Sequence, residues 1–324
     1  MASISSHTVL LGQSEREYIL EGCRQDCRLD GRTCQEVRPY VIVTPTATQE
    51  APLILSHGSA RLLSANSCSD GESTQLLCSV KAELTQPTAL RPDQGMVELH
   101  VDAMVAGISR RLCDDLQASL MHLLGDSLVD TRALCVLPNV YAWRLHIDVY
   151  VVSQAGSLLD AASRVVRAAL ENTKLPALDV LPATSHESIH QATAETTQAT
   201  SVVVDGDIHN ASPLPGVDAG PLIVTVTVMQ SLDANHRPVT TLLLDATAAE
   251  EACAMVQVHL AVVTTPPAIA AVRKTGTGSL SLALLPEITK LALHAASQND
   301  HAYTRKCSSE PSSAWLLQGL YELK

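Results

Sequence analysis

The chain has 324 residues, of which 46% are hydrophobic and 17% charged, so its composition excludes a disordered protein and leaves room for a sizeable core. It contains no Phe, two Trp and six Tyr, so the core must be aliphatic. Single-stranded nucleic acid is usually held by aromatic stacking as well as charge. With few aromatic residues and a net charge of −12, the chain is not expected to bind nucleic acid alone; any contact would be local and made by a few Arg and Lys.

No apolar run approaches the roughly 20 residues of a membrane span, and residues 1–12 lack the basic and apolar regions of a secretory signal. The nine Cys are odd in number and loosely spaced, which favours free thiols over a disulfide framework. Cys23, Cys27 and Cys34 form the one cluster, but zinc sites usually contain two tight pairs. We therefore expect neither a membrane segment nor a metal or other cofactor.

The first half of the sequence predicts a helix followed by strands. Residues 14–28 form the helix, with Ser14 as its cap and Glu17 completing a capping box, and the Asp30-Gly31 turn breaks it. Four strand-like runs follow, at 40–43, 58–63, 76–84 and 96–101. The polar stretch 64–75 is expected to be an exposed hairpin loop, longer than usual.

Helical and strand periodicities then alternate. Residues 116–124 look helical, and 133–137 and 143–152 look like paired strands. In the second of these strands, apolar residues alternate with polar ones, which predicts one buried face and one more polar face. The clearest helix is 158–170, because its apolar residues recur at helical spacing.

Residues 184–220 differ in composition and are expected to be a long polar insertion with one strand at 202–204. His186 and His190 within it are better explained by a solvated loop than by a metal site. Strands are predicted again, at 221–229, 239–245, 256–263 and 269–274, followed by an amphipathic helix at 284–296. The polar tail from Ser297 is expected to be loose, with Trp315 and its apolar neighbours able to dock elsewhere. No clean linker interrupts this order, so we predict one α+β domain built from two related halves.

An ordered set of short motifs along this chain resembles the RNase PH-like family. It begins with Arg28-Leu29-Asp30-Gly31-Arg32 after the first helix and Gly58-Ser59-Ala60-Arg61 at a strand opening. The others are Val80-Lys81-Ala82-Glu83, Pro92-Asp93-Gln94-Gly95, Ile147-Asp148-Val149, Gly156-Ser157-Leu158-Leu159-Asp160-Ala161, Leu244-Asp245-Ala246-Thr247, and the stretch 273–280. Each motif alone is weak, but the ordered set, over roughly 14–296, is fairly specific.

The resemblance implies an RNase PH-like domain, related to the second domain of ribosomal protein S5, at 36–296. It would be preceded by an N-terminal helical extension at 1–35, interrupted by insertions at 64–75 and 184–220, and followed by a tail at 297–324. Such chains form a hexameric ring with RNA passing through its centre. The branch that this sequence resembles is the inactive partner subunit of the exosome ring. The implied partners are other RNase PH-like subunits, RNA-binding cap subunits, an associated exoribonuclease and RNA, and the implied locations are the nucleus, nucleolus and cytoplasm.

Active members of that family cleave RNA with inorganic phosphate, which requires a cationic phosphate pocket and acidic residues that act as acid or hold Mg²⁺. Of the two family Asp positions, six residues apart, the first falls on Glu251 and the second on Gln257, which cannot ionise. The segment that should carry a phosphate-binding Arg, 123–127, contains none. An Asp-Gly-Gly signature is replaced by Ala155-Gly156-Ser157. We therefore expect no catalytic residues.

Other acidic residues have plainer explanations. Glu250 and Glu251 are expected to be exposed in the first turn of a helix or bulge, where the helix dipole favours negative charge. Asp148 is expected on the polar face of its strand, and Asp160 in the first turn of helix 158–170.

A few basic residues are candidates for RNA contact. Arg110 and Arg111 lie where the resemblance places the lining of the central pore, although Asp114 and Asp115 could equally neutralise them as a solvated pair. Three further candidates are Arg61 at its strand opening and Arg273-Lys274 beside a glycine turn. The turn lacks the order of a P-loop, so nucleotide binding is not expected.

The sequence thus favours a non-catalytic structural subunit of the ring that helps to line the RNA channel. Two alternatives remain at this stage. The chain could be an active phosphate-dependent 3′-to-5′ exoribonuclease that uses displaced carboxylates such as Asp245 and Glu251, or a pure assembly protein that does not touch RNA.

Overall fold

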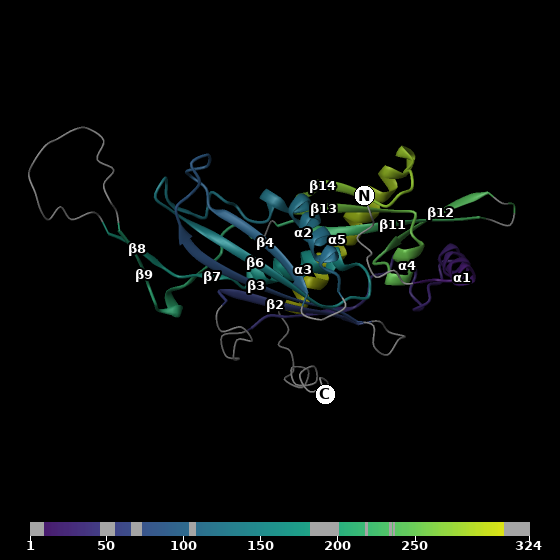
Figure 1. The fold of residues 1–324 in the computed structure, drawn as a ribbon, viewed down its shortest axis with the longest axis horizontal. Helices are drawn as coiled ribbons and strands as arrows, with labels where there is room; N and C mark the ends of the chain where they lie inside the picture. Colours follow the sequence, from purple (N-terminus) through teal and green to yellow (C-terminus); the bar gives the residue numbers. More distant parts are fainter. Residues whose placement is uncertain are drawn as a thin grey trace, which may run out of the picture.

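Two β-sheets with helices between them make the frame of the computed structural model (Figure 1). The described residues are 10–45, 56–65, 73–103, 108–181, 201–217, 220–232, 235 and 237–307. Among these residues, no helix is both long enough and apolar enough to cross a membrane.

The first sheet follows the order β1-β2-β3-β6-β4, with β5 paired to β6. These strands are β1 (Tyr40–Val43), β2 (Gly58–Ala65), β3 (Ser73–Thr85), β4 (Met96–Ala103), β5 (Cys135–Leu137) and β6 (Tyr141–Ser153). All pairs are antiparallel except β4 with β6, which run parallel. The β2–β3 ladder extends to Ala65 opposite Ser73, so the strands take up part of the loop predicted at 64–75. One face of this sheet is buried and the other is partly open, as the alternation in β6 predicted.

Two helices lie against the buried face. Helix α3 (Leu158–Glu171) is buried along nearly its whole length, because it packs on β2 and β3 on one side and on the second sheet on the other. Helix α2 (Arg110–Leu123) packs against β4 and reaches the second sheet at its edge.

The second sheet is antiparallel in the order β12-β11-β13-β14, formed by β11 (Leu222–Leu232), β12 (Pro238–Leu244), β13 (Val256–Thr264) and β14 (Pro267–Thr275). Helix α5 (Leu285–Cys307) packs on β11 and β13. In both of these strands, successive residues are buried, because helices cover the two faces of the sheet. The expected α+β architecture of two halves is confirmed.

Three helix boundaries differ from the sequence prediction. Helix α1 (Gln13–Arg24) is capped at Gly12, whose backbone N–H donates to Glu15 at 2.8 Å, instead of at Ser14 with Glu17. Helix α2 begins at Arg110, earlier than the predicted start at 116, because Ser109 caps it. The prediction started later because the apolar periodicity becomes clear only there. Helix α5 continues to Cys307, past the predicted end at 296. The sequence did not reveal this extension, because its polar residues form no apolar stripe that periodicity could detect.

Shorter elements complete the chain. The predicted strand at 202–204 is β9 (Ser201–Val204), which pairs with β8 (Leu178–Leu181) in a ribbon that extends from the body in Figure 1. The remaining elements are β7 (Lys174–Leu175), β10 (Ser212–Pro213), α4 (Ala248–Cys253) and three short 3-10 helices, η1 (Gly125–Ser127), η2 (Ile208–Asn210) and η3 (Leu282–Leu284). His186, His190 and Trp315 lie outside the described residues.

Candidate functional site

A small cleft opens where the start of α3 meets the second sheet. Its free volume of about 30 Å³ has room for ordered water. Residues from both halves of the fold line it, namely Leu112, Gln154, Gly156, Ser157, Leu158, Leu159, Thr225, Ala248, Glu251, Gln257 and His259.

Among the described lining residues, Glu251 contributes the one carboxyl group. It lies in the first turn of α4, as predicted, but it is partly buried, because its Oε1 accepts the backbone N–H of Ser157 at 2.8 Å. Burial raises the pKa of Glu251 to about 7, and the nearby charges of Asp160 and Asp245 act in the same direction. The expectation of an exposed residue is therefore wrong for Glu251.

The same correction applies to Glu250, which is buried and forms an ion pair with Arg28. Arg28 Nε donates to one carboxylate oxygen of Glu250 at 2.9 Å and Nη2 to the other at 2.5 Å. Glu250 also closes a capping box by accepting the backbone N–H of Thr247 at 2.7 Å. Sequence periodicity did not reveal this, because the partner of Glu250 comes from the opposite end of the chain.

A chain of polar side chains runs behind the cleft. Asp160, in the first turn of α3 as predicted, accepts the hydroxyl of Thr225 at 2.5 Å and its backbone N–H at 3.0 Å. The same hydroxyl lies 2.8 Å from Nδ1 of His259, whose Nε2 lies 2.9 Å from the hydroxyl of Thr275. Burial raises the pKa of Asp160 to about 6 and, with the charge of Arg273, lowers that of His259 to about 3. His259 is therefore a neutral hydrogen-bonding link at physiological pH.

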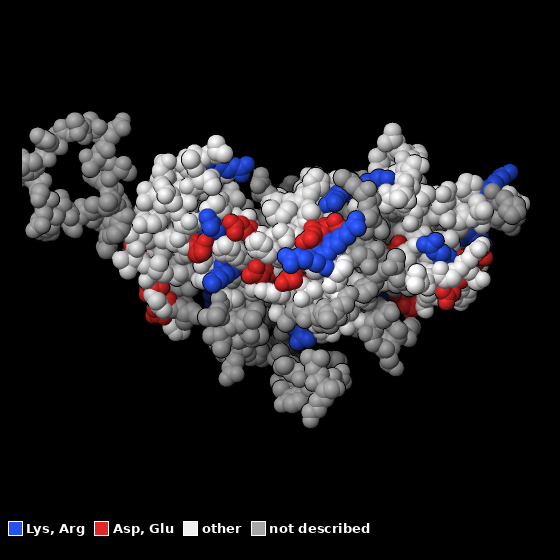
Figure 2. All heavy atoms as spheres, viewed as in Figure 1, with Lys and Arg blue, Asp and Glu red and all other residues white. Residues whose placement is uncertain are grey.

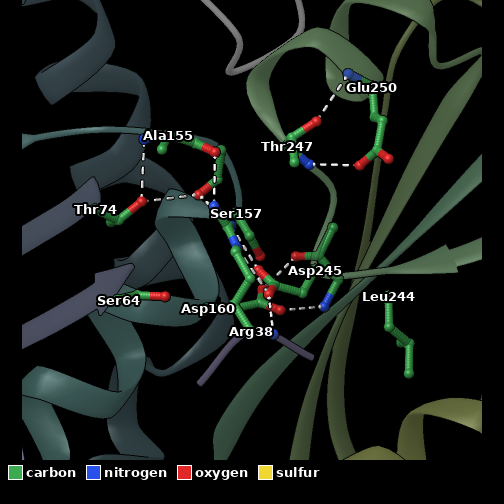
Figure 3. A network of polar contacts seen from close by, with 12 residues as sticks. Arg38, Ser64, Thr74, Ala155, Ser157, Asp160, Leu244, Asp245, Thr247 and Glu250 are labelled. Atoms are coloured by element: carbon green, nitrogen blue, oxygen red, sulfur yellow. Dashed lines mark hydrogen bonds and ion pairs between the residues drawn. The ribbon is translucent and has the colours of Figure 1, made fainter. Parts of the chain in front are cut away.

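Asp245 lies at the centre of a buried ion cluster beside the cleft (Figure 3). Arg38 donates to its carboxylate from the backbone at 2.7 Å, from Nε at 2.9 Å and from Nη2 at 2.7 Å. Arg32 Nη1 adds a bond of 3.1 Å. Although burial opposes ionisation, the hydrogen bonds and charges of these arginines lower the pKa of Asp245 to about 2. Its carboxylate is thus fully occupied and does not face the cleft as a free acid.

The turn before α3 forms one wall of the cleft. Gly156 has a φ of 94°, and a Cβ atom there would lie 2.4 Å from the carbonyl oxygen of Ala246, so this position requires glycine. Ser157 has a φ of 50°, the left-handed conformation that glycine adopts more readily, and its hydroxyl is buried without a partner in the described structure. Ser157 is therefore a strained residue in the wall of the cleft.

The described lining of the cleft is mostly uncharged. Gln257, which the sequence motifs were expected to align with a family acid, is buried in β13 and lines the cleft, and its amide can neither ionise nor act as a general acid. None of the described lining residues is Arg or Lys. Residues 123–127 lie at the far end of α2 from Leu112, so they are not placed to supply a phosphate ligand here.

The five basic candidates do not share one surface. Arg110 and Arg111 are exposed in the first turn of α2, immediately before Leu112 of the cleft. A band of basic and acidic side chains crosses the middle of the face shown in Figure 2, where Figure 1 places α2. Arg273 and Lys274 lie on β14, which contacts α2. Arg61 lies on β2, where it points away from the helical layer.

Three of these candidates have partners within the chain, and one of them is Lys274, whose Nζ donates to the carbonyl oxygen of Gly276 at 3.4 Å. Arg273 Nη1 donates to the hydroxyl of Ser119 at 2.7 Å and so ties β14 to α2. Arg61 Nη2 donates to the side chain of Gln75 at 3.2 Å across the β2–β3 ladder.

Parts of the chain are similar in sequence to known proteins. Residues 36–176 match the 3′ exoribonuclease family, domain 1. The chain is 28% identical over 174 residues both to exosome complex component Rrp42 of Sulfurisphaera tokodaii and to exosome complex component RRP45 of Danio rerio. Each match covers 51% of this chain, but only 58% and 40% of the two relatives, so the chain spans about half their length.

The similarity in fold extends further than the similarity in sequence. The structure of an Archaeoglobus fulgidus exosome with RNA bound to the active site has a subunit that matches 89% of this chain and 97% of its own length, with a TM-score of 0.62 and 21% identity. Residues 36–176 therefore match domain 1 of the 3′ exoribonuclease family, and the chain has the fold that exosome core structures share.

Proposed function

We propose that the chain is a non-catalytic structural subunit of an RNase PH-like exosome ring. In that role it supports 3′-to-5′ processing and degradation of RNA, including ribosomal RNA processing, and helps to line the RNA channel. The observation that carries the proposal is Gln257, which lines the cleft and which the order of motifs aligns with the second carboxylate of an active enzyme of this family.

The electrostatics of the cleft support the absence of catalysis. Phosphorolysis brings together two anionic phosphates, and enzymes stabilise that charge with cations or bound Mg²⁺. Among the described lining residues, Glu251 is the single carboxyl group and none is Arg or Lys, while Asp245 is held by Arg32 and Arg38. The described part of the site therefore offers neither a cationic cradle nor a pair of free acids to hold a metal.

The start of α2 is the surface proposed to contact RNA. Arg110 and Arg111 add two positive charges to a helix N-terminus, where unpaired backbone N–H groups and the helix dipole already favour phosphate. Arg273 and Lys274 on the neighbouring β14 extend this basic surface. Arg61, on another face, is proposed as a separate contact to RNA or to an adjoining subunit.

The proposed partners follow from this role. They are other RNase PH-like subunits in a hexameric ring, RNA-binding cap subunits, an associated exoribonuclease and the RNA itself. The acidic chain depends on these partners for most of the positive field around the RNA. The nucleus, nucleolus and cytoplasm are the proposed locations.

Incubating labelled single-stranded RNA with phosphate and Mg²⁺ tests the proposal, first with the purified chain and then with the assembled ring. The lone chain should release no nucleoside diphosphates but should assemble with its partners. RNA should crosslink to Arg110 or Arg111 in the assembly; assembly without any crosslink would favour a pure scaffold that does not touch RNA.

One observation favours the alternative of an active phosphorolytic enzyme. A carboxyl group with a pKa of about 7, such as Glu251, is suited to give up and take back a proton at neutral pH. If the lone chain degrades RNA only in the presence of phosphate, and Glu251→Gln abolishes this activity, the enzyme proposal replaces the structural one.

A further inference from the structure

The outer face of the first sheet carries a cluster of two histidines and a carboxylate, remote in the fold from the cleft. Glu98, His100 and His146 place one ligand atom each so that all three atoms lie within 4.8 Å of one another. We propose that these three residues bind a Zn²⁺ ion. The proposal depends neither on RNA binding nor on assembly into a ring.

The backbone register creates the cluster. Strands β4 and β6 run parallel, with Glu98 directly opposite His146. His100 follows Glu98 by two residues, and side chains two apart on a strand point to the same face of the sheet. The three side chains therefore meet through sheet geometry alone, although 46 residues separate His100 from His146 in the sequence.

The distances fit a common metal ion. Tetrahedral zinc, with bonds of about 2.0–2.1 Å, places neighbouring ligand atoms roughly 3.4 Å apart. Nδ1 of His146 already lies 3.2 Å from Oε2 of Glu98. His100 is exposed, so its side chain is free to rotate into the third position.

The other ring nitrogen of His146 has the partner that metal-binding histidines usually have. Nε2 lies 3.2 Å from Oε1 of Glu83, and Arg144 Nη1 lies 3.2 Å from the same oxygen. A carboxylate on the far nitrogen fixes the ring orientation and makes the ligating nitrogen more basic. Glu83 can serve in this role, with Arg144 holding it in place.

Ligand type and local charge favour zinc. Two imidazoles and one carboxylate suit Zn²⁺, whereas Mg²⁺ and Ca²⁺ prefer oxygen ligands alone. On this face of β3, β4 and β6, Glu83, Glu98, Asp102 and Asp148 oppose Lys81 and Arg144, so two negative charges remain to offset the cation. Three protein ligands leave a fourth position for water or for a donor from another molecule.

Cobalt titration of the full chain tests the proposal, because Co²⁺ substitutes for Zn²⁺ and has a visible spectrum. The wild-type chain should bind one equivalent with the spectrum of nitrogen and oxygen ligands, and Zn²⁺ should displace it. The variant His100→Ala/His146→Ala should lose that equivalent. A matched variant with two other exposed histidines replaced, His122→Ala/His209→Ala, should keep it.

Two further variants separate metal binding from a merely structural role. His100→Ala alone removes the histidine outside the ion pairs, and it should weaken Co²⁺ binding at least tenfold without changing the circular dichroism spectrum. Glu98→Gln should weaken binding as well. The proposal is wrong if the double histidine variant binds Co²⁺ like the wild type, if no equivalent binds, or if a thiolate-to-cobalt band shows that cysteines hold the ion.

Discussion

The backbone N–H of Ser157 donates to Oε1 of Glu251 at 2.8 Å, and this bond joins the turn before α3 to the first turn of α4. The two residues come from different halves of the fold, so the cleft between them is part of the packing between the halves. Its acidic residues therefore influence how the two halves pack, whether or not they ever contacted a substrate.

Replacing Glu251 by Gln should make stability less dependent on pH. The ordinary pKa of 4.5 rises to about 7 in the folded chain, so the folded state holds a proton that the unfolded state releases. Wild-type stability should therefore fall as the pH rises from about 4.5 to about 7. Asp160, raised from 3.8 to about 6, acts with the same sign.

Because Gln cannot ionise, the free energy of unfolding of Glu251→Gln should be close to that of the wild type near pH 5. At pH 8 it should exceed the wild-type value by an amount on the order of 1–3 kcal/mol. Urea unfolding at the two pH values measures this difference. Glu287→Gln, at an exposed position of α5, is the control and should change neither value. Equal effects of Glu251→Gln at both pH values would contradict the assignment.

Asp245→Asn should strongly destabilise the chain at neutral pH. The substitution leaves the buried charges of Arg32 and Arg38 uncompensated, which costs about 3–5 kcal/mol in comparable buried pairs. Since the pKa of Asp245 falls from 3.8 to about 2, its contribution is present above about pH 4 and lost as the pH falls toward 2. Thermal unfolding against pH measures both effects, with Glu287→Gln, at an exposed position of α5, as a control that should change little.

Arg110→Ala/Arg111→Ala should weaken RNA binding by the assembled ring and lower its salt dependence. Each lost phosphate contact reduces the slope of log affinity against log salt by roughly one. The control Arg91→Ala/Arg132→Ala removes the same charge from exposed positions elsewhere. If both double variants bind RNA equally well at each salt concentration, the start of α2 is not an RNA contact.

Ser157→Gly should stabilise the chain by about 1 kcal/mol. Removing a side chain from the left-handed conformation should stabilise the folded chain by about 1–2 kcal/mol. The greater conformational freedom of glycine stabilises the unfolded chain and offsets about 0.4–1 kcal/mol of this gain. The backbone N–H that binds Glu251 remains. Chemical denaturation would detect the gain, whereas Ser279→Gly, at a position without positive φ, should give none.

The sequence was sufficient for the larger elements because their apolar periodicity is strong. Strand β1 was predicted at its observed bounds, and the helix predicted at 158–170 is α3, buried between two sheets. Apolar periodicity did not predict the helix ends correctly, because the helix can continue through polar residues that form no apolar stripe. The last turns of α5 show this most clearly.

The candidate site was only partly predictable. Glu251 and Gln257 were found through motif order, but Thr225 and His259 occupy buried strands whose neighbours are apolar, and nothing local marks them as linked to Asp160. The Glu98–His146 cluster was missed for a related reason. Its ligands lie on two strands whose pairing is set by the tertiary fold, not by spacing along the chain.

The ion pair of Arg28 with Glu250 also bears on how the protein is made. The two residues are 222 positions apart, so a ribosome must synthesise most of the chain before the partner of Arg28 exists. Until then, the segment after α1 carries an arginine whose native position is buried. Completion of the fold thus waits for the second half, and a truncated product would lack the pair that joins its beginning to its end.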